Sequence, residues 1–309
     1  MNFWSLQKEG KIDGKFFCNL YKCCKEINIQ DLKNGTRKNT YEAMQSYINI
    51  DENSPTLVTH AGDWGIKKNQ CSITSKNIYA YTIEDATHGG VYLNLEIDSV
   101  LPNVKRWFMS NMGQLLHEKI YPVPLNILKK DWQGIDINQL RHVKKEKLCY
   151  ANFTITSPYR IRVAEWAWGE KYIDCHFPKR YANQDIELSM PILKEQRLSM
   201  QQFTEVLSSY HFCIAPTGNG LDTFRTWECI LCNTVPIVQD NWMNRVFSKI
   251  WPMIIVQRYE FTDVYKKINE FHEQYGKVNY DYSLLLEENF DLLLDRIEYE
   301  SNRLRREYI

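Results

Sequence analysis

The sequence predicts an α/β fold in two domains. Short apolar stretches of strand length alternate with segments of helical periodicity, which is the pattern of a sheet covered by helices. The chain has 309 residues, about twice the usual size of one domain. Its hydrophobic fraction of 44% is enough for a large core. We expect a first domain over residues 1–147, a second over residues 148–280, and a C-terminal helix within residues 281–309.

Three candidate strands lie in the first half, at residues 55–60, 104–110 and 120–125. The last contains Pro122 and Pro124, which cannot donate to a strand ladder, so we place it at a sheet edge or a domain border. Residues 131–147 are polar and end in a basic run, which predicts a solvated linker.

The second half repeats strand and helix more regularly. Strands are expected at residues 148–155, 211–216, 234–238 and 253–256, and helices at residues 159–168, 199–210, 221–232 and 282–306. Leucines at helical spacing mark the last helix as amphipathic. The strand, glycine-rich turn, helix and strand between residues 211 and 238 form the unit that binds ligands at the carboxyl end of a parallel sheet.

Composition excludes several classes of function. Lys+Arg and Asp+Glu are each 38, and no long basic stripe occurs, so nucleic-acid binding is disfavoured. Nine cysteines, an odd count without an export signal, indicate reduced thiols rather than a disulfide framework. No apolar stretch approaches the roughly 20 residues of a spanning helix. We therefore expect a soluble, cytoplasmic protein with no transmembrane segment.

Residues 212–228, FCIAPTGNGLDTFRTWE, carry the most chemical information. Gly218 and Gly220 allow a sharp turn and a close approach of the backbone to a ligand. The helix that follows presents unpaired N–H groups and a positive dipole end to an anion such as a diphosphate. Asp222 or Thr223 is placed to cap that helix.

Arg225 and Glu228 are three residues apart, so they project from one face of the same helix. An arginine at this place neutralises the charge that develops on a diphosphate leaving group. A glutamate one turn later accepts hydrogen bonds from ribose hydroxyls. On spacing alone, a glycine-rich loop with a surface ion pair explains the residues equally well.

The block GNGLDTFRTWE at residues 218–228, followed by VPIV at residues 235–238, resembles the donor-binding signature of exostosin-like glycosyltransferases. Weaker similarities at residues 57–63, 107, 122–125, 150–154 and 160 extend the resemblance over roughly residues 55 to 240. The resemblance implies a GT-B architecture, in which two Rossmann-like domains face each other across a cleft and the last helix packs back on the first domain. Small members without a membrane anchor are encoded by large DNA viruses and bacteria.

The resemblance also implies roles for individual residues. Arg225 is expected on the donor diphosphate and Glu228 on the ribose. Arg160 and Arg162 are second candidates for the phosphates, with a solvated helix face as the alternative. The remaining donor-site candidates, at the phosphate end and the cleft edge, are Gly218, Asn219, Gly220, Asp222, Asn152 and Thr154.

An inverting sugar transfer needs a base that takes the proton of the acceptor hydroxyl. In this architecture the base comes from the first domain. Our candidate is Asp63, which lies in the loop after a predicted strand, and His60 is its partner or substitute. A turn-forming role of Asp63 beside Gly62 is the alternative. The next candidates for the base are Glu84, Asp85 and His88.

The expected activity is transfer of a sugar, such as xylose, glucuronic acid or a hexose, from a UDP-sugar to a hydroxyl of a glycan or glycopeptide. We expect no metal or other cofactor, because the chain has no Asp-x-Asp motif at a strand end. Two alternatives stay open: a GDP-sugar enzyme of the fucosyltransferase kind, and a non-catalytic protein that binds nucleotide-sugars or glycans. Four aromatic residues of the first half are candidates for stacking on acceptor sugars or for the core: Trp64, Tyr79, Tyr81 and Tyr92.

Overall fold

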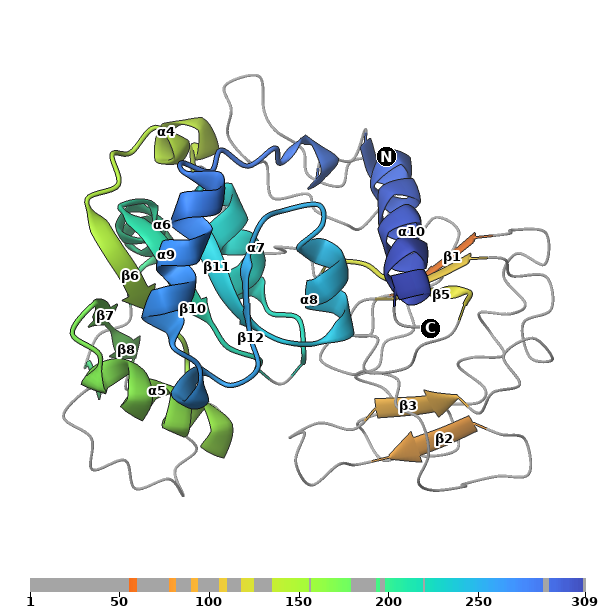
Figure 1. Cartoon of the computed structure of the whole chain (residues 1–309), viewed down its shortest axis with the longest axis horizontal. Helices are drawn as coiled ribbons and strands as arrows, with labels where there is room; N and C mark the ends of the chain where they lie inside the picture. The colour runs from red at the N-terminus through yellow and green to blue at the C-terminus, as the bar shows by residue number, and fades with distance from the viewer. Residues whose placement is uncertain are drawn as a thin grey trace.

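The computed structural model describes residues 56–59, 78–81, 90–93, 106–109, 118–124, 135–155, 157–178, 193–194, 198–218, 220–285 and 289–307. These residues form two parallel sheets, one in each half of the chain, and two short pairs of strands. Figure 1 shows the larger sheet with its helices, and the smaller sheet beside the last helix of the chain. The α/β class predicted from the sequence is confirmed.

The smaller sheet is built from β1 (Thr56–Thr59), β4 (Arg106–Met109) and β5 (Ile120–Pro122), in the order β1-β4-β5. Both pairings are parallel. All three strands were expected, and β5 lies at an edge as its prolines predicted. Strands β2 (Ile78–Tyr81) and β3 (Gly90–Leu93) form a separate antiparallel pair.

The larger sheet has five parallel strands in the order β12-β11-β10-β6-β7. They are β6 (Lys147–Ala151), β7 (Ile173–Cys175), β10 (Tyr210–Ala215), β11 (Val235–Gln239) and β12 (Ile254–Val256). Strand β6 is first in sequence but lies inside the sheet, so the chain winds outward in both directions from it. The point where the direction changes, between β6 and β10, is where open sheets of this kind bind ligands, outside the carboxyl ends of the strands.

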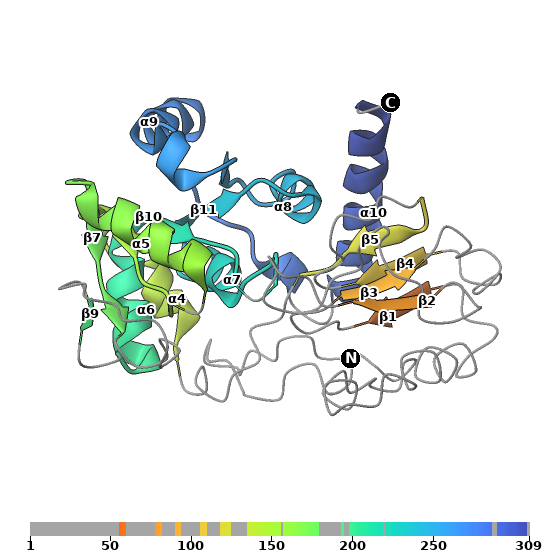
Figure 2. The same ribbon diagram turned by 90° about the horizontal axis from the view of Figure 1, so that it is seen from below.

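Helices cover both faces of this sheet, and Figure 2 shows α9 on one side and α6 on the other. The helices are α5 (Pro158–Gly169), α6 (Met200–Ser208), α7 (Phe224–Leu231), α8 (Trp242–Phe247) and α9 (Val264–Tyr275). Local sequence sets where several begin. Ser157 caps α5 with Pro158 in its first turn, and Ser199 forms a capping box with Gln202 at the start of α6. A short parallel pair, β8 (Phe177–Pro178) and β9 (Leu193–Lys194), lies between α5 and α6 in the sequence.

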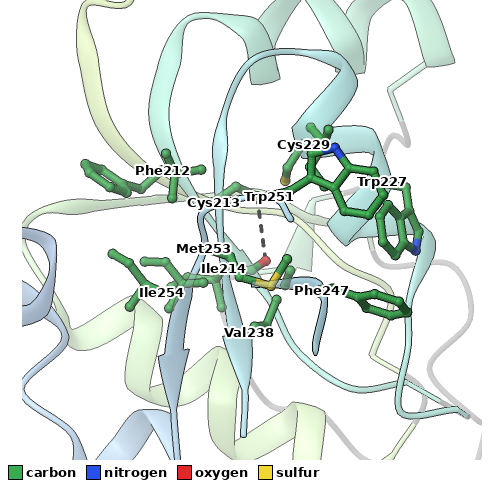
Figure 3. Packing of buried hydrophobic residues seen from close by; sticks show 14 of the residues in the cluster. Phe212, Cys213, Ile214, Trp227, Cys229, Val238, Phe247, Trp251, Met253 and Ile254 are labelled. Atoms are coloured by element: carbon green, nitrogen blue, oxygen red, sulfur yellow. Dashed lines mark hydrogen bonds between the residues drawn. The ribbon is translucent and has the colours of Figure 1, made fainter. Parts of the chain in front are cut away.

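In the core around the larger sheet, three large aromatic side chains meet beside α7 and α8. Trp227 is fully buried, and its ring makes T-shaped contacts with Phe247 at 5.1 Å and Trp251 at 5.3 Å between centroids (Figure 3). Five of the nine cysteines fall in the described residues, and these five are free. Burial raises the pKa of Cys232 to about 12, so this thiol stays protonated at neutral pH.

The solvated linker expected at residues 131–147 is only partly correct, because its end is largely exposed but it contains a helix and one half-buried lysine. Residues Ile137–Arg141 form helix α4, capped by Asp136, and Lys145 is half-buried between the exposed Lys144 and Glu146. The ammonium of Lys145 donates to the carbonyl oxygens of Ser208 (3.0 Å), Tyr210 (2.9 Å) and Cys232 (3.3 Å). Two of these carbonyls belong to the ends of α6 and α7, which need donors and attract a cation. The polarity of residues 131–147 does not reveal that these helix-end carbonyls need a hydrogen-bond donor.

A pH-dependent contribution to stability follows from Lys145. Burial lowers its pKa from 10.5 to about 8, so the unfolded chain binds more protons than the native protein between these values. The free energy of unfolding therefore increases with pH across that window, and Lys145 contributes on the order of 2 kcal/mol to this increase. We expect the difference in unfolding free energy between wild type and Lys145→Met, from urea titrations, to increase from pH 7.5 to pH 10.

The matched control is Lys144→Met, since the side chain of Lys144 is 85% exposed. It removes one lysine charge from the same segment without touching the buried carbonyls. A Lys145→Met difference that stays constant or shrinks as the pH rises would show that Lys145 is charged throughout the window.

The last helix, α10 (Phe290–Glu307), follows a short 3-10 turn at Ser283–Leu285 and lies against the sheet of the first half. Arg106 of β4 pairs with Asp295 at 2.6 Å and with Glu298 at 3.2 Å. Arg305 donates to the carbonyl oxygen of Glu118 at 2.9 Å. Helix α10 also packs on α8, so it contacts both units. None of the described helices is long and apolar enough to cross a membrane.

Candidate functional site

Most of the described donor-site candidates come together where β6 and β10 end. Asn152 and Thr154 follow β6, and Gly218 to Asp222 follow β10, its parallel neighbour. Helix α7 begins directly after this second loop. The parallel pairing therefore brings residues that are more than 60 positions apart in sequence to the same edge of the sheet, at the point where ligands bind in this topology.

Arg225 and Glu228 form an ion pair, with 2.8 Å between Nη1 and Oε2. It is not a surface pair, because the two side chains are only 15% and 6% exposed. A second nitrogen of Arg225, Nη2, donates to Oδ1 of Asn152 at 3.4 Å, which connects α7 to the end of β6. The guanidinium lies over the ring of Phe203, 3.9 Å from its centroid. The surface-pair alternative for these residues is therefore wrong.

The environment of Arg225 favours an anion. Burial by itself would lower the pKa of Arg225, but Glu228, together with Cys213 and Cys229, outweighs burial and the pKa is raised, so the guanidinium stays charged. Among the described residues, Nε of Arg225 has no acceptor although it is buried. A buried donor without an acceptor is costly. Arg225 therefore has hydrogen-bonding capacity that a ligand oxygen would satisfy.

Asn152 is held in place from both sides. Its amide nitrogen donates to the hydroxyl of Tyr150 at 3.0 Å, while its oxygen accepts from Arg225. Burial raises the pKa of Tyr150 to about 12, so its hydroxyl remains protonated. The amide of Asn152 is thus held between the hydroxyl of Tyr150 and the guanidinium of Arg225.

Asp222 is turned inward, toward α7. It is 2% exposed, and its carboxylate accepts from the backbone N–H of Thr223 at 2.8 Å and from the indole of Trp227 at 2.9 Å. Helix α7 accordingly begins at Phe224 instead of residue 221, with Thr223 as its N-cap residue. Asp222 therefore links the loop after β10 to the core through its hydrogen bond with Trp227.

Arg160 and Arg162 have different surroundings although they lie on the same turn of α5. Arg160 donates to carbonyl oxygens of both loops at the sheet edge. Arg162 is 57% exposed; it lies 3.9 Å from Glu260 and over the ring of Tyr159, 5.8 Å from its centroid. For Arg162 the solvated-face alternative matches its surroundings, whereas Arg160 contacts both loops at the sheet edge.

Several predicted site residues lie outside the described part of the chain. These are the candidate bases and their neighbours and one glycine-loop residue: His60, Asp63, Trp64, Glu84, Asp85, His88 and Asn219. Tyr79 and Tyr81 lie on β2, and Tyr92 lies on β3. Gly220 is described, and its carbonyl oxygen accepts from the N–H of Gly218 at 3.0 Å.

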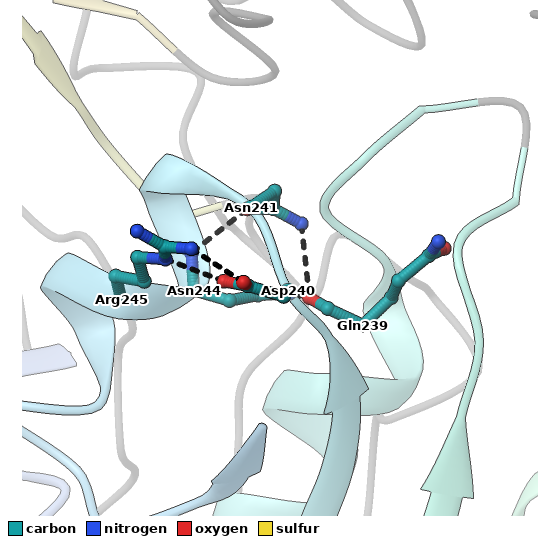
Figure 4. Close-up of polar contacts among 5 residues, drawn as sticks. All are labelled: Gln239, Asp240, Asn241, Asn244 and Arg245. Carbon is teal, nitrogen blue, oxygen red and sulfur yellow. Dashed lines mark hydrogen bonds and ion pairs between the residues drawn. The ribbon is translucent and has the colours of Figure 1, made fainter. Parts of the chain in front are cut away.

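A polar corner at the end of β11 was missed by the sequence analysis. Gln239 accepts from the hydroxyl of Thr217 at 3.0 Å, so this corner adjoins the loop after β10. Asp240 forms a two-point ion pair with Arg245, 2.5 Å at each contact, and the amide of Asn244 donates to the Gln239 carbonyl at 2.7 Å (Figure 4). The available signal was the polar triplet that directly follows VPIV at the carboxyl end of a predicted strand.

Comparisons with known proteins assign no family. No protein-family model matches the chain, and no curated protein matches it in sequence. Among solved structures, the spinosyn rhamnosyltransferase SpnG, in complex with thymidine diphosphate, is similar over 88% of this chain and 78% of that chain, with a TM-score of 0.36 and 11% sequence identity. A similarity of this size carries no argument about activity. The α/β class therefore rests on the parallel sheets of this chain, and the exostosin-like resemblance of residues 218–228 stays a prediction.

Proposed function

We propose that this chain is a glycosyltransferase that moves a sugar from a UDP-sugar to a hydroxyl of a glycan. One observation carries the proposal: a buried, charged arginine with an unused donor, Arg225, sits beside the switch point of a parallel sheet. This is the combination that a nucleoside diphosphate needs, because its charge is matched by a guanidinium in a site that excludes water. The two sheets are proposed as the two domains of a GT-B architecture.

The ion pair of Arg225 and Glu228 suggests how a donor is accepted. A diphosphate offers Arg225 a stronger partner than one carboxylate, since it supplies several charged oxygens. When Arg225 turns its donors to the diphosphate, the carboxylate of Glu228 becomes available to the ribose hydroxyls. The two residues thus exchange one contact for two, Arg225 with the diphosphate and Glu228 with the ribose hydroxyls.

The chemical step is proposed as an inverting displacement. The acceptor oxygen attacks the anomeric carbon while the bond from that carbon to the diphosphate oxygen breaks. The proton of the acceptor hydroxyl passes to the carboxylate of Asp63, and the nucleoside diphosphate leaves with its negative charge held by Arg225. In this account a metal ion is not needed for the diphosphate, because the guanidinium supplies the positive charge.

The proposal is tested by nucleotide release from a panel of UDP-, GDP- and CMP-sugars, each with and without EDTA. We expect slow hydrolysis of one UDP-sugar at the same rate in EDTA. Asp63→Asn is expected to keep UDP binding and to lose turnover by roughly 100-fold or more, the usual contribution of a general base.

The outcomes separate the alternatives. Release from a GDP-sugar alone would replace the uridine assignment, and loss of release in EDTA would replace the metal-independent mechanism. A donor that binds without being turned over would indicate a non-catalytic binding protein. Absence of both binding and release would overturn the proposal.

A further inference from the structure

The guanidinium of Arg160 joins the two loops of the candidate site. Its Nη1 donates to the carbonyl of Thr154 at 2.8 Å, in the loop after β6. Its Nε donates to the carbonyl of Thr217 at 2.9 Å and its Nη2 to that of Pro216 at 3.2 Å, both in the loop after β10. Three different nitrogens of one side chain are therefore used on backbone oxygens of segments more than 60 residues apart.

Gly218 makes room for this arrangement. A Cβ atom at position 218 would lie 2.7 Å from Nη2 and 3.3 Å from Cζ of Arg160. Positive φ angles occur, among the described residues, only at Asn233 and Gly276, so the backbone at 218 does not itself require glycine. The first glycine of the GNG loop is thus needed for the approach of the Arg160 guanidinium, which is a different reason from the sharp turn expected from the sequence.

We infer that Arg160 is a positioning residue that clips the loops after β6 and β10 together, and that it is not a phosphate ligand. Arginine suits this task because its donors spread over a rigid planar fork, whereas the donors of lysine leave from a single point. The clip holds the segment that carries Asn152, the partner of Arg225, against the loop that leads into α7. Loops that are ordered before a ligand arrives do not have to be ordered on binding, so affinity rises.

The expected effect on UDP affinity rests on the proposed function, but the contacts of Arg160 with the two loops do not. Two measurements therefore test it: hydrogen exchange of the free protein, and UDP affinity by calorimetry. In Arg160→Gln we expect amides of residues 152–155 and 217–222 to exchange at least about tenfold faster, while amides of β6 and β10 keep their rates. Arg306→Gln, an exposed arginine on α10, is the control for loss of one positive charge.

The UDP affinities of Arg160→Lys and Arg160→Gln, compared with each other, decide whether Arg160 holds the two loops together or binds a phosphate. For a clip, Arg160→Lys and Arg160→Gln weaken UDP by the same factor, about 10- to 100-fold, and raise the donor KM more than they change kcat. For a phosphate ligand, Arg160→Lys retains most of the affinity, because its charge remains. That second result would overturn the inference.

A double-mutant cycle with Gly218→Ala adds an independent test. The added methyl group displaces the guanidinium, so Gly218→Ala is expected to weaken UDP about as much as Arg160→Gln does. In the Arg160→Gln background the same change should cost less than about twofold, since the clip is already lost. If the losses of UDP affinity in the two single variants multiply in the double variant, the two residues act separately, which contradicts the clip.

The two proposals fail in different ways. If wild type binds no UDP, the proposed function is wrong, and the exchange of residues 152–155 and 217–222 still decides the role of Arg160. If wild type binds UDP but Arg160→Gln leaves these exchange rates unchanged, the clip is wrong and the proposed function stands.

Discussion

Replacement of Arg225 by methionine is expected to weaken UDP binding about 100-fold or more and to destabilise the fold by about 3–5 kcal/mol. The loss of stability arises because Glu228, only 6% exposed, keeps a buried charge without its partner. The loss of affinity arises because charge-assisted bonds to the diphosphate disappear, which corresponds to about 100-fold or more in Kd. Calorimetry with UDP and urea titrations measure the two effects separately.

The double variant Arg225→Met/Glu228→Gln separates ligand binding from folding. It removes both buried charges, so most of the lost stability is expected to return, while UDP binding stays weak. Glu228→Gln alone is the matched control, because it retains the Arg225 guanidinium. If the double variant recovers UDP binding together with stability, Arg225 acts through the fold and does not contact the diphosphate.

Replacement of Trp227 by alanine is expected to be the most damaging change in the core, at about 3–5 kcal/mol of unfolding free energy. Its ring fills the space between Phe247 and Trp251, and its indole N–H donates to Asp222. The change therefore leaves a cavity and a buried carboxylate with one donor fewer. Urea unfolding measures the effect.

The control for Trp227 is Trp168→Ala, because Trp168 is 49% exposed on α5. It is expected to change the unfolding free energy by less than about 0.5 kcal/mol. If the two variants lose similar stability, the contact between α7 and α8 is not the main packing of this unit. A Trp227→Ala protein that keeps UDP affinity would show that the Asp222 link does not position the loop.

Four of the five strands of the larger sheet, and helices α5, α6 and α7, were predictable from local pattern, whereas β7, α8 and α9 were not predicted. Continuous apolar runs mark the buried parallel strands β10 and β11, and Ser157-Pro158 marks the start of α5. The start of α7 was placed three residues too early. There the side chain of Asp222 accepts hydrogen bonds from the backbone N–H of Thr223 and from the indole of Trp227. The contact with the buried Trp227 ring depends on tertiary packing, so local sequence patterns do not predict where the helix begins.

The roles of charged residues were harder to predict than their positions. Lys145 and Arg160 look alike in sequence to the solvated Lys144 and Arg162, yet both are held by backbone carbonyls. What distinguishes them is where helix ends and loop carbonyls converge, which depends on strand order. The pairing of β6 with β10 brings Asn152 to Arg225, and the sequence shows neither that pairing nor that contact.

The central claim is that the switch point between β6 and β10 holds a nucleoside diphosphate, and calorimetry with wild type in EDTA tests it most directly. UDP, UMP and uridine are titrated in turn, so that the phosphate contribution is isolated. The account predicts that UDP binds about 10- to 100-fold more tightly than UMP, because Arg225 contacts the phosphate that UMP lacks. Equal affinities for UDP and uridine, or no binding of any of the three, would contradict it.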